Sequence, residues 1–350
     1  MSGPGTSAHP APPRVLVVGA TPLPDSLEWH VMDTLRAMNI PAKILHPRHG
    51  IWKSLFIERV VNKLAGTLLR EPELLIESRL LAAVREFEPG FIFVIHGGQL
   101  SPKSVEKLRA ITRAPIACWF QDQLTGLGRQ FLLGSRYDAV FLKDRYMESL
   151  FSRMIKSTTF HYLPECCNPR VHFPVDLSAE DRARYACDVM IAGTLYYYRQ
   201  EILEQLSGAD IRVWGTLPDW LLYRLPRAHE RRAIVTQEKA KAIAAARICL
   251  NTLHYAEVNS LNCRAFETAG CGGFQLVTSV PVLSEHFKPG EELVAFDSGP
   301  DLVEKVRHYL KHPQEAAQIA RRGQLRAHRD HTYEIRLAQI LKVCTGYEAS

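Results

Sequence analysis

The chain has 350 residues, of which 46% are hydrophobic and 23% charged, and its formal net charge is +6. This composition is ordinary for a soluble globular protein and predicts about two domains. The charge is mild and no dense Lys/Arg block occurs, so we expect no nucleic-acid partner, and no apolar run reaches the roughly 18 residues of a transmembrane helix.

Residues 1–13, MSGPGTSAHPAPP, are expected to form a disordered tail, because they are rich in Pro, Gly, Ser and Ala and almost uncharged. They lack the basic and apolar regions of a signal peptide.

Residues 14–167 are predicted to form a first α/β domain. Helical patterns cover residues 26–39 and 51–88. Strands alternating with helices predict a parallel sheet with helices on its faces. The opening loop contains Gly19 but no G-x-G-x-x-G motif, so the dinucleotide-binding fingerprint is absent. The predicted strands are residues 14–19, 42–45, 91–95, 115–120 and 139–142.

Polar residues follow three of these strands. His96 comes after the run 91–95, Asp122 after the run 115–120, and the segment 143–145 after the last run. The carboxyl ends of strands line the ligand crevice of open α/β sheets, so His96 and Asp122 are our candidate catalytic residues. The alternative is that His96 belongs to a turn and that Asp122 caps the next segment.

Residues 168–330 are predicted to form a second α/β domain, which begins after a crossover that contains prolines. Gly193 and Thr194 follow its first strand, and the next helix carries Arg199. The predicted strands are residues 188–193, 211–215, 248–251 and 293–296, and the predicted helices are residues 237–246, 301–310 and 313–328. A last helix is expected within residues 331–350.

The segment 259–277 carries the strongest functional signal: a polar loop, a short helix, a Gly-rich turn and a strand. Asn259 or Ser260 is the expected cap of the helix, because a short polar side chain accepts a free backbone N–H there. Gly272 and Gly273 are expected to end the helix, because glycine tolerates positive φ.

Projected at about 100° per residue, this helix has two different arcs. The helix follows the carboxyl end of a strand and presents a polar arc there. The free N–H groups and the positive dipole end of such a helix suit a phosphate. The alternative is an ordinary amphipathic helix with a solvated Arg264–Glu267 pair. The predicted core arc is Leu261, Ala265, Phe266 and Ala269, and the predicted polar arc is Arg264, Glu267 and Cys271.

The eight cysteines include no Cys-x-x-Cys pair, so we expect no structural zinc site. Several lie in apolar runs, which favours a reducing, cytoplasmic compartment. The sequence also contains no Asp-x-Asp triplet, the carboxylate pair that would hold a divalent cation at a diphosphate.

Several segments resemble CgeB-type glycosyltransferases, relatives of the GT-B enzymes that include the retaining family-4 transferases. The resemblance covers residues 187–342 well, and it is weaker in the first half, where FIFVIHGGQL, YDAVFLKD and YLPECCNPRVHFP occur in the family's order. The segments of the second half are DVMIAGTLYYYRQEIL, IRVWG, ICLNT, SLNCRAFETAGCGGFQLV, VLSEHFKPGEELVAF, DLVEKVRHYLKHP and HTYEIR.

This resemblance implies a GT-B fold: two Rossmann-like domains with parallel sheets that face a central cleft. It implies that the C-terminal domain holds a nucleotide-diphosphate sugar as co-substrate, with no cofactor, and that the N-terminal domain holds the acceptor. The helix within residues 331–350 would cross back to the N-terminal domain.

The resemblance also assigns donor-binding residues. Glu267 matches the glutamate that holds the ribose hydroxyls, Gly272 and Gly273 match a turn that lets the backbone approach the donor, and Arg199 lies near the expected diphosphate. The full predicted donor set is Gly193, Thr194, Arg199, Asn259, Ser260, Leu261, Asn262, Arg264, Glu267, Gly272 and Gly273, with no metal ligand.

One departure from the family concerns the sugar. Family-4 enzymes often carry a second glutamate at the position of Asn259, whose amide can bind a sugar hydroxyl but has no charge. Glu257 lies two residues earlier and could compensate for it.

The leading hypothesis is a glycosyltransferase that is metal-independent, retains configuration and acts on an unknown glycan, protein or small-molecule acceptor. Two alternatives stay open: a sugar-nucleotide epimerase or hydrolase on the same fold, and a non-catalytic GT-B binding module.

Overall fold

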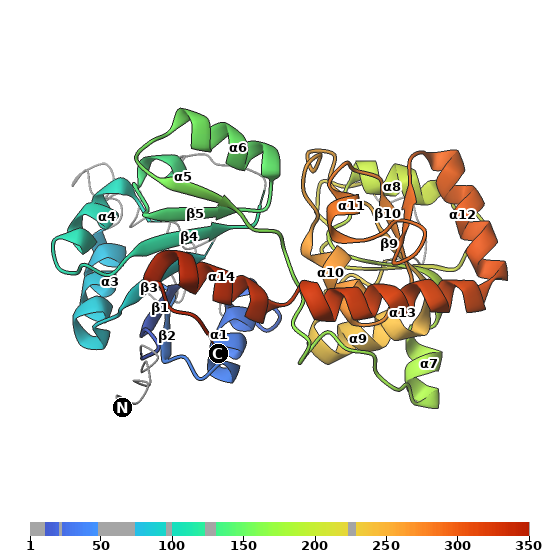
Figure 1. Cartoon of the computed structure of the whole chain (residues 1–350). Coiled ribbons are helices and arrows are strands. Elements are labelled where there is room, and N and C mark those ends of the chain that lie inside the picture. Colours follow the sequence, from blue (N-terminus) through green and yellow to red (C-terminus); the bar gives the residue numbers. More distant parts are fainter. Residues whose placement is uncertain are drawn as a thin grey trace, which may run out of the picture. The chain divides into compact units, whose positions relative to one another are not determined.

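A computed structural model describes residues 11–20, 23–47, 74–95, 100–122, 131–222 and 229–349. The chain divides into two compact units (Figure 1). The first unit holds residues 1–142, 147–163 and 336–350, and the second holds residues 143–146 and 164–335. For comparison, the sequence placed the domain limits at residues 167 and 330.

The first unit is built on a six-stranded parallel sheet with the order β2-β1-β3-β4-β5-β6. Each residue of β3 and β4 is buried, which explains why both strands are continuous apolar runs in the sequence. The strands are β1 (Val15–Val18), β2 (Ala42–Leu45), β3 (Phe91–Ile95), β4 (Ile116–Phe120), β5 (Ala139–Leu142) and β6 (Thr159–Tyr162).

The helices of the first unit bury apolar stripes against this sheet. Leu80 and Val84 of one helix and Val105 and Leu108 of another pack with Ile92 and neighbouring strand residues. The helices are α1 (Leu27–Ala37), α3 (Leu74–Phe87), α4 (Pro102–Arg109), α5 (Phe131–Gly134) and most of α6 (Arg145–Met154) and α14 (Tyr333–Thr345). The helix predicted over residues 51–88 is α3 in its last part, and residues 51–73 lie outside the described residues.

The second unit contains a five-stranded parallel sheet with the order β11-β10-β9-β7-β8 and helices on both faces (Figure 1). Its strands are β7 (Cys187–Ala192), β8 (Ile211–Trp214), β9 (Ala246–Asn251), β10 (Gln275–Thr278) and β11 (Val294–Phe296). Its helices are α7 (Ala179–Tyr185), α8 (Tyr197–Glu204), α9 (Thr236–Ala245), α10 (Cys263–Gly270), α11 (Leu283–His286), α12 (Gly299–Lys311) and α13 (Pro313–Asp330).

The predicted α/β fold with two parallel sheets is confirmed, and two elements near the predicted crossover were missed. β6 is an edge strand in which Phe160 alone is buried, so it lacks an apolar run. α7 is polar, and its start is fixed by a capping box in which Ser178 and Asp181 bond each other's backbone N–H.

Each sheet reverses its strand order beside its first strand. In the second unit β7 lies between β8 and β9, so the chain leaves β7 toward one side of the sheet and leaves β9 toward the other. The loops that follow these two strands therefore diverge, which is where open α/β sheets bind ligands.

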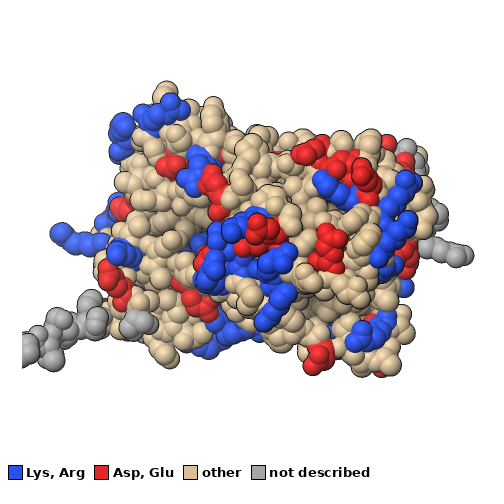
Figure 2. Space-filling view, turned by 45° about the vertical axis from the view of Figure 1, so that its right-hand side comes forward, with Lys and Arg blue, Asp and Glu red and all other residues tan. Residues whose placement is uncertain are grey.

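Among the described residues, no helix is long and apolar enough to cross a membrane. On the face drawn in Figure 2, Lys and Arg lie interspersed with Asp and Glu.

Gly323 tests the packing of α13. A Cβ atom at this position would lie 2.2 Å from the carbonyl oxygen of Glu292. Alanine in a free helix stabilises by about 0.5–1 kcal/mol over glycine, but here we expect Gly323→Ala to destabilise by about 1–3 kcal/mol through overpacking. Urea unfolding measures this change, with the exposed Gln318→Ala in the same helix as the control. A more stable Gly323→Ala protein would contradict the packing.

Candidate functional site

Arg199 joins the two loops that diverge at the carboxyl edge of the second sheet. From the start of α8, its Nε donates to Thr252 Oγ1 at 2.8 Å and its Nη2 donates to the Thr252 carbonyl at 3.2 Å, just after β9. Its Nη1 donates to the Thr194 carbonyl, just after β7. The guanidinium is 2% exposed and lies over the ring of Tyr196.

Arg264 of α10 brings a second guanidinium to the same place. A Cβ atom on Gly193 would lie 2.5 Å from Arg264 Nη1 and 3.3 Å from Arg199 Nη1, so both groups lie against the turn after β7. Gly193 has φ +144°, a backbone conformation that residues other than glycine rarely adopt. Glycine is therefore required here both by the backbone and by the arginines.

Two neighbouring cations at one turn would favour an anion beside them. Burial, and then the charge of Arg264, lower the pKa of Arg199 to about 10, so the protonated form is less stable here than in water. Arg264 is half-buried and has no hydrogen bond or ion pair with another described residue. An anion at this turn would stabilise the buried charge of Arg199 and would give Arg264 a partner.

The N-terminus of α10 is capped by Asn262, and the prediction of Asn259 or Ser260 as the cap is wrong. Asn262 Oδ1 accepts from Ala265 N at 3.2 Å, and its amide exchanges two hydrogen bonds of 2.9 Å with Asn251, the last residue of β9. This amide pair fixes the helix to the end of the strand. It also uses the side chain of Asn262, which the sequence had assigned to the donor.

The two arcs predicted for α10 are correct for the core side and partly wrong for the polar side. Phe266 and its arc are buried in one apolar cluster with Leu261, so the Leu261 side chain is a core element. Cys271, predicted on the polar arc, is 2% exposed and belongs to an apolar cluster with Met190 and Ile243.

Glu267 is buried and ion-paired, which overturns the solvated Arg264–Glu267 pair as an alternative. It is 6% exposed, and its Oε2 accepts from Lys239 Nζ of α9 at 2.9 Å. His172 Nε2 lies 3.9 Å from its Oε1. Sequence reasoning missed Lys239, since lysines at helical spacing are usually solvated.

A small cavity of about 20 Å³ lies among Lys239, Arg264 and Glu267, with Asn251 and Thr268 also lining it. This volume is enough to hold one water molecule. Arg264 and Glu267, both predicted to bind the donor, therefore line one cavity.

Ser260 and Glu257 each carry a buried oxygen atom without a hydrogen-bond partner among the described residues: Ser260 Oγ and Glu257 Oε2. Glu257 Oε1 accepts from Lys143 Nζ at 2.7 Å. Burial opposes the charge of Lys143, but Glu257 and Glu165 outweigh it and raise the pKa of Lys143. Asn259 is half-buried, and its carbonyl accepts from Arg145 N at 3.4 Å.

The two glycines after α10 have different functions in the fold. Gly272 has φ +74° and follows the end of the helix, as predicted. Gly273 allows close packing instead, because a Cβ there would lie 2.5 Å from Ile243 Cγ2.

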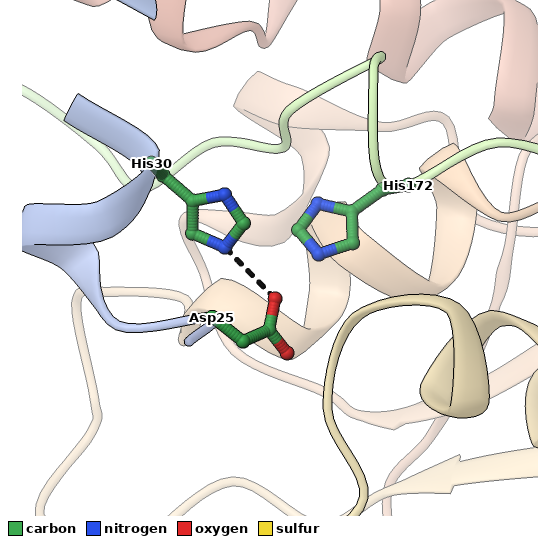
Figure 3. Close-up of side chains that lie close together, drawn as sticks. All are labelled: Asp25, His30 and His172. Carbon is green, nitrogen blue, oxygen red and sulfur yellow. Dashed lines mark hydrogen bonds and ion pairs between the residues drawn. The ribbon is translucent and has the colours of Figure 1, made fainter. Parts of the chain in front are cut away.

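In the first unit, Asp122 is exposed in the loop after β4, and His96 lies outside the described residues. Sequence reasoning missed a buried pair at the start of α1, in which His30 Nε2 and Asp25 Oδ1 are 2.9 Å apart (Figure 3). Asp25 has φ +65°, uncommon for a residue other than glycine. The spacing of five residues across a helix start gave no recognisable signal.

Comparison with known proteins bears on the family and on the fold. Residues 199–342 match the family model described as glycosyl transferase-like. No curated protein sequence matches the chain. The C-terminal half is thus similar to glycosyl transferase-like domains. The prediction of a glycosyltransferase is confirmed at this level.

Solved structures share the fold over nearly the whole length. Sucrose-phosphate synthase (tll1590) from Thermosynechococcus elongatus has a TM-score of 0.65 at 12% identity, with 94% of this chain and 98% of that chain covered. Anabaena Alr3699/HepE, solved with UDP-glucose, has a TM-score of 0.64 at 13% identity, with 95% and 100% covered. A glycosyltransferase from Rickettsia africae has a TM-score of 0.58 at 10% identity, with 95% and 97% covered. The predicted GT-B fold is confirmed.

The capping of α10 can be tested by its effect on stability. Asn262→Ala removes the cap, at about 0.5–2 kcal/mol, and leaves the buried Asn251 amide without a partner, at about 1–3 kcal/mol. We therefore expect a melting temperature several degrees lower, at about 2–4 °C per kcal/mol for a domain of this size. Scanning calorimetry measures it. Asn259→Ala is the matched control, because the Asn259 side chain makes no hydrogen bond to a described residue; equal melting of the two variants would contradict the assigned cap.

Proposed function

We propose that the chain transfers a sugar from a nucleoside-diphosphate sugar to an acceptor, with the donor held by the second unit. The observation that carries this proposal is the pair of guanidinium groups, Arg199 and Arg264, on the turn at Gly193. The Arg264 fork suits two phosphate oxygens, while Arg199, which donates to Thr194 and Thr252, adds a buried positive charge beside it. Two solved structures of Alr3699/HepE contain UDP-glucose or UDP with glucose, which supports a donor of this class.

The same groups would serve the chemistry. When the bond between the sugar carbon and the phosphate oxygen breaks, negative charge develops on the departing diphosphate. Arg199 is already fixed by its hydrogen bonds to Thr194 and Thr252, and Arg264 lies against the same turn, so their positive charges would stabilise the developing charge with little reorganisation. The N-terminus of α8 begins at Tyr196 without a side-chain cap, and its free N–H groups would add to the positive potential.

Glu267 is proposed to accept hydrogen bonds from the ribose. A carboxylate has about four lone-pair positions, so it can accept from Lys239 and from a ribose hydroxyl together. Glu257, with one buried oxygen unpartnered, is proposed to bind a sugar hydroxyl in place of the charge that Asn259 lacks, with Ser260 beside it. Thr194, Gly272 and Gly273 would contribute backbone around the donor.

On the acceptor side, Asp122 is proposed to accept a proton from the attacking hydroxyl, and His96 to bind the reacting sugar. The acceptor is a glycan, a protein or a small molecule. We further propose a CgeB-type enzyme that retains configuration, needs no cofactor and acts in the cytoplasm. The eight cysteines, all free thiols, support a reducing compartment.

The first test is a binding screen. We expect one of UDP, ADP, GDP, CDP and dTDP to stabilise the protein by about 2.7 kcal/mol at a hundredfold excess over Kd. Arg264→Gln should weaken that binding about 10–100-fold, the range for hydrogen bonds to charged groups. Calorimetric titration measures both effects, and the exposed Arg307→Gln in α12 is the matched control. Equal affinity in Arg264→Gln and the parent would remove Arg264 from the site, and no binding at all would overturn the proposal.

Glu267 needs a paired design, because it also balances the charge of Lys239. Glu267→Gln leaves the Lys239 ammonium buried without its partner, at about 3–5 kcal/mol. The double variant Glu267→Gln with Lys239→Met should recover much of that stability while still binding the nucleoside diphosphate weakly. Melting temperature and Kd are measured for each. Recovery of parental affinity in the double variant would mean that Glu267 is only structural.

Transfer is also expected to survive chelation. The sequence lacks the Asp-x-Asp pair, and the two arginines supply positive charge where a metal-dependent enzyme would use a cation. Product formation is compared with and without excess EDTA. Complete loss of transfer, restored by magnesium or manganese, would exclude the metal-independent mechanism.

A further inference from the structure

Tyr196 stands at the junction between the turn at Gly193 and helix α8. It is the N-cap residue of α8, with φ −146° and ψ 166°, and its side chain makes no capping hydrogen bond. The phenol is therefore available for something other than holding the helix start.

Its ring is fixed on several sides within the second unit. Arg199 Cζ lies 4.7 Å from the ring centroid, so the guanidinium covers one face. The ring of Tyr198 is stacked on it, with the centroids 6.5 Å apart and an interplanar angle of 13°. The ring of His254, in the loop after β9, has its centroid 5.5 Å from that of Tyr196. These contacts leave the hydroxyl little freedom of direction.

The hydroxyl itself is buried and has no hydrogen-bond partner among the described residues. A buried polar atom in this state is costly and needs an explanation. The charged groups that act on it are Arg199, Arg264 and Glu257, and burial, the largest effect, raises the pKa of the phenol. At neutral pH Tyr196 is therefore a protonated O–H donor beside two cations.

We infer that the Tyr196 hydroxyl donates a hydrogen bond to a phosphate oxygen of the nucleoside diphosphate. This inference rests on the proposed function. A phosphate is favoured over a sugar hydroxyl because two guanidinium groups adjoin the phenol and attract an anion. As the sugar–oxygen bond breaks, its electron pair passes to the phosphate oxygen, and the phenol keeps its proton while its hydrogen bond strengthens.

Tyr196→Phe tests this, because it keeps the ring on Arg199 and removes only the oxygen. The probes are the best-binding of UDP, ADP, GDP, CDP and dTDP and the corresponding nucleoside, titrated by calorimetry and by ligand-observed NMR. We expect diphosphate affinity to fall about tenfold, nucleoside affinity to stay the same, and the melting temperature of the free protein to be equal or higher. Tyr198→Phe, whose ring is 39% exposed, is the matched control and should change none of these values.

The possible outcomes separate this inference from the proposed function. If the parent binds one of the diphosphates and Tyr196→Phe binds it equally well, the inference about Tyr196 is overturned while the proposed function stands. If diphosphate and nucleoside affinities fall together, or the melting temperature drops, Tyr196 has a structural role and the inference is again overturned. If the parent binds none of the five diphosphates, both proposals fail.

Discussion

The second unit depends on one buried cation. Taking a guanidinium out of water is costly unless its donors are used, and Arg199 uses them on the Thr194 carbonyl and on the hydroxyl and carbonyl of Thr252. These acceptors belong to the loops after β7 and β9, which run in opposite directions from the sheet. One side chain therefore holds both edges of the crevice, and Gly193 is the residue that lets Arg264 approach the same turn.

The sequence predicts the fold well wherever burial produces a pattern. β3 is a run of five apolar residues that is buried on both faces, and its predicted and observed limits are the same. β6 has one buried residue and α7 is nearly all polar, so neither produces an apolar run or a helical stripe. Their positions are decided by pairing with β5 and by a capping box, which depend on geometry that a hydrophobicity pattern does not contain.

The candidate site divides in the same way. Gly193, Arg264 and Glu267 could be chosen from sequence because they follow a strand end or project from one helix. Arg199 was assigned through the family resemblance. Lys239 could not be chosen from sequence, because it lies 28 residues before Glu267 on a different helix. The Asn251–Asn262 amide pair could not be predicted from sequence either. Because of it, the helix is capped by Asn262 and not by the expected Asn259 or Ser260.

Burial of Glu267 bears on its chemistry as well as on stability. A solvated carboxylate would exchange water for a ribose hydroxyl with little net gain, whereas one that is 6% exposed has already lost most of its water. Lys239 compensates the charge at Oε2 of Glu267. The other oxygen, Oε1, lies 3.9 Å from His172 Nε2, which is beyond hydrogen-bond distance. A carboxylate can accept more than one hydrogen bond, and in a site of low dielectric each bond is stronger than in water. Glu267 can therefore form a structural ion pair with Lys239 and also contact a ribose. The ion pair fixes the orientation of the carboxylate that the ribose contact needs.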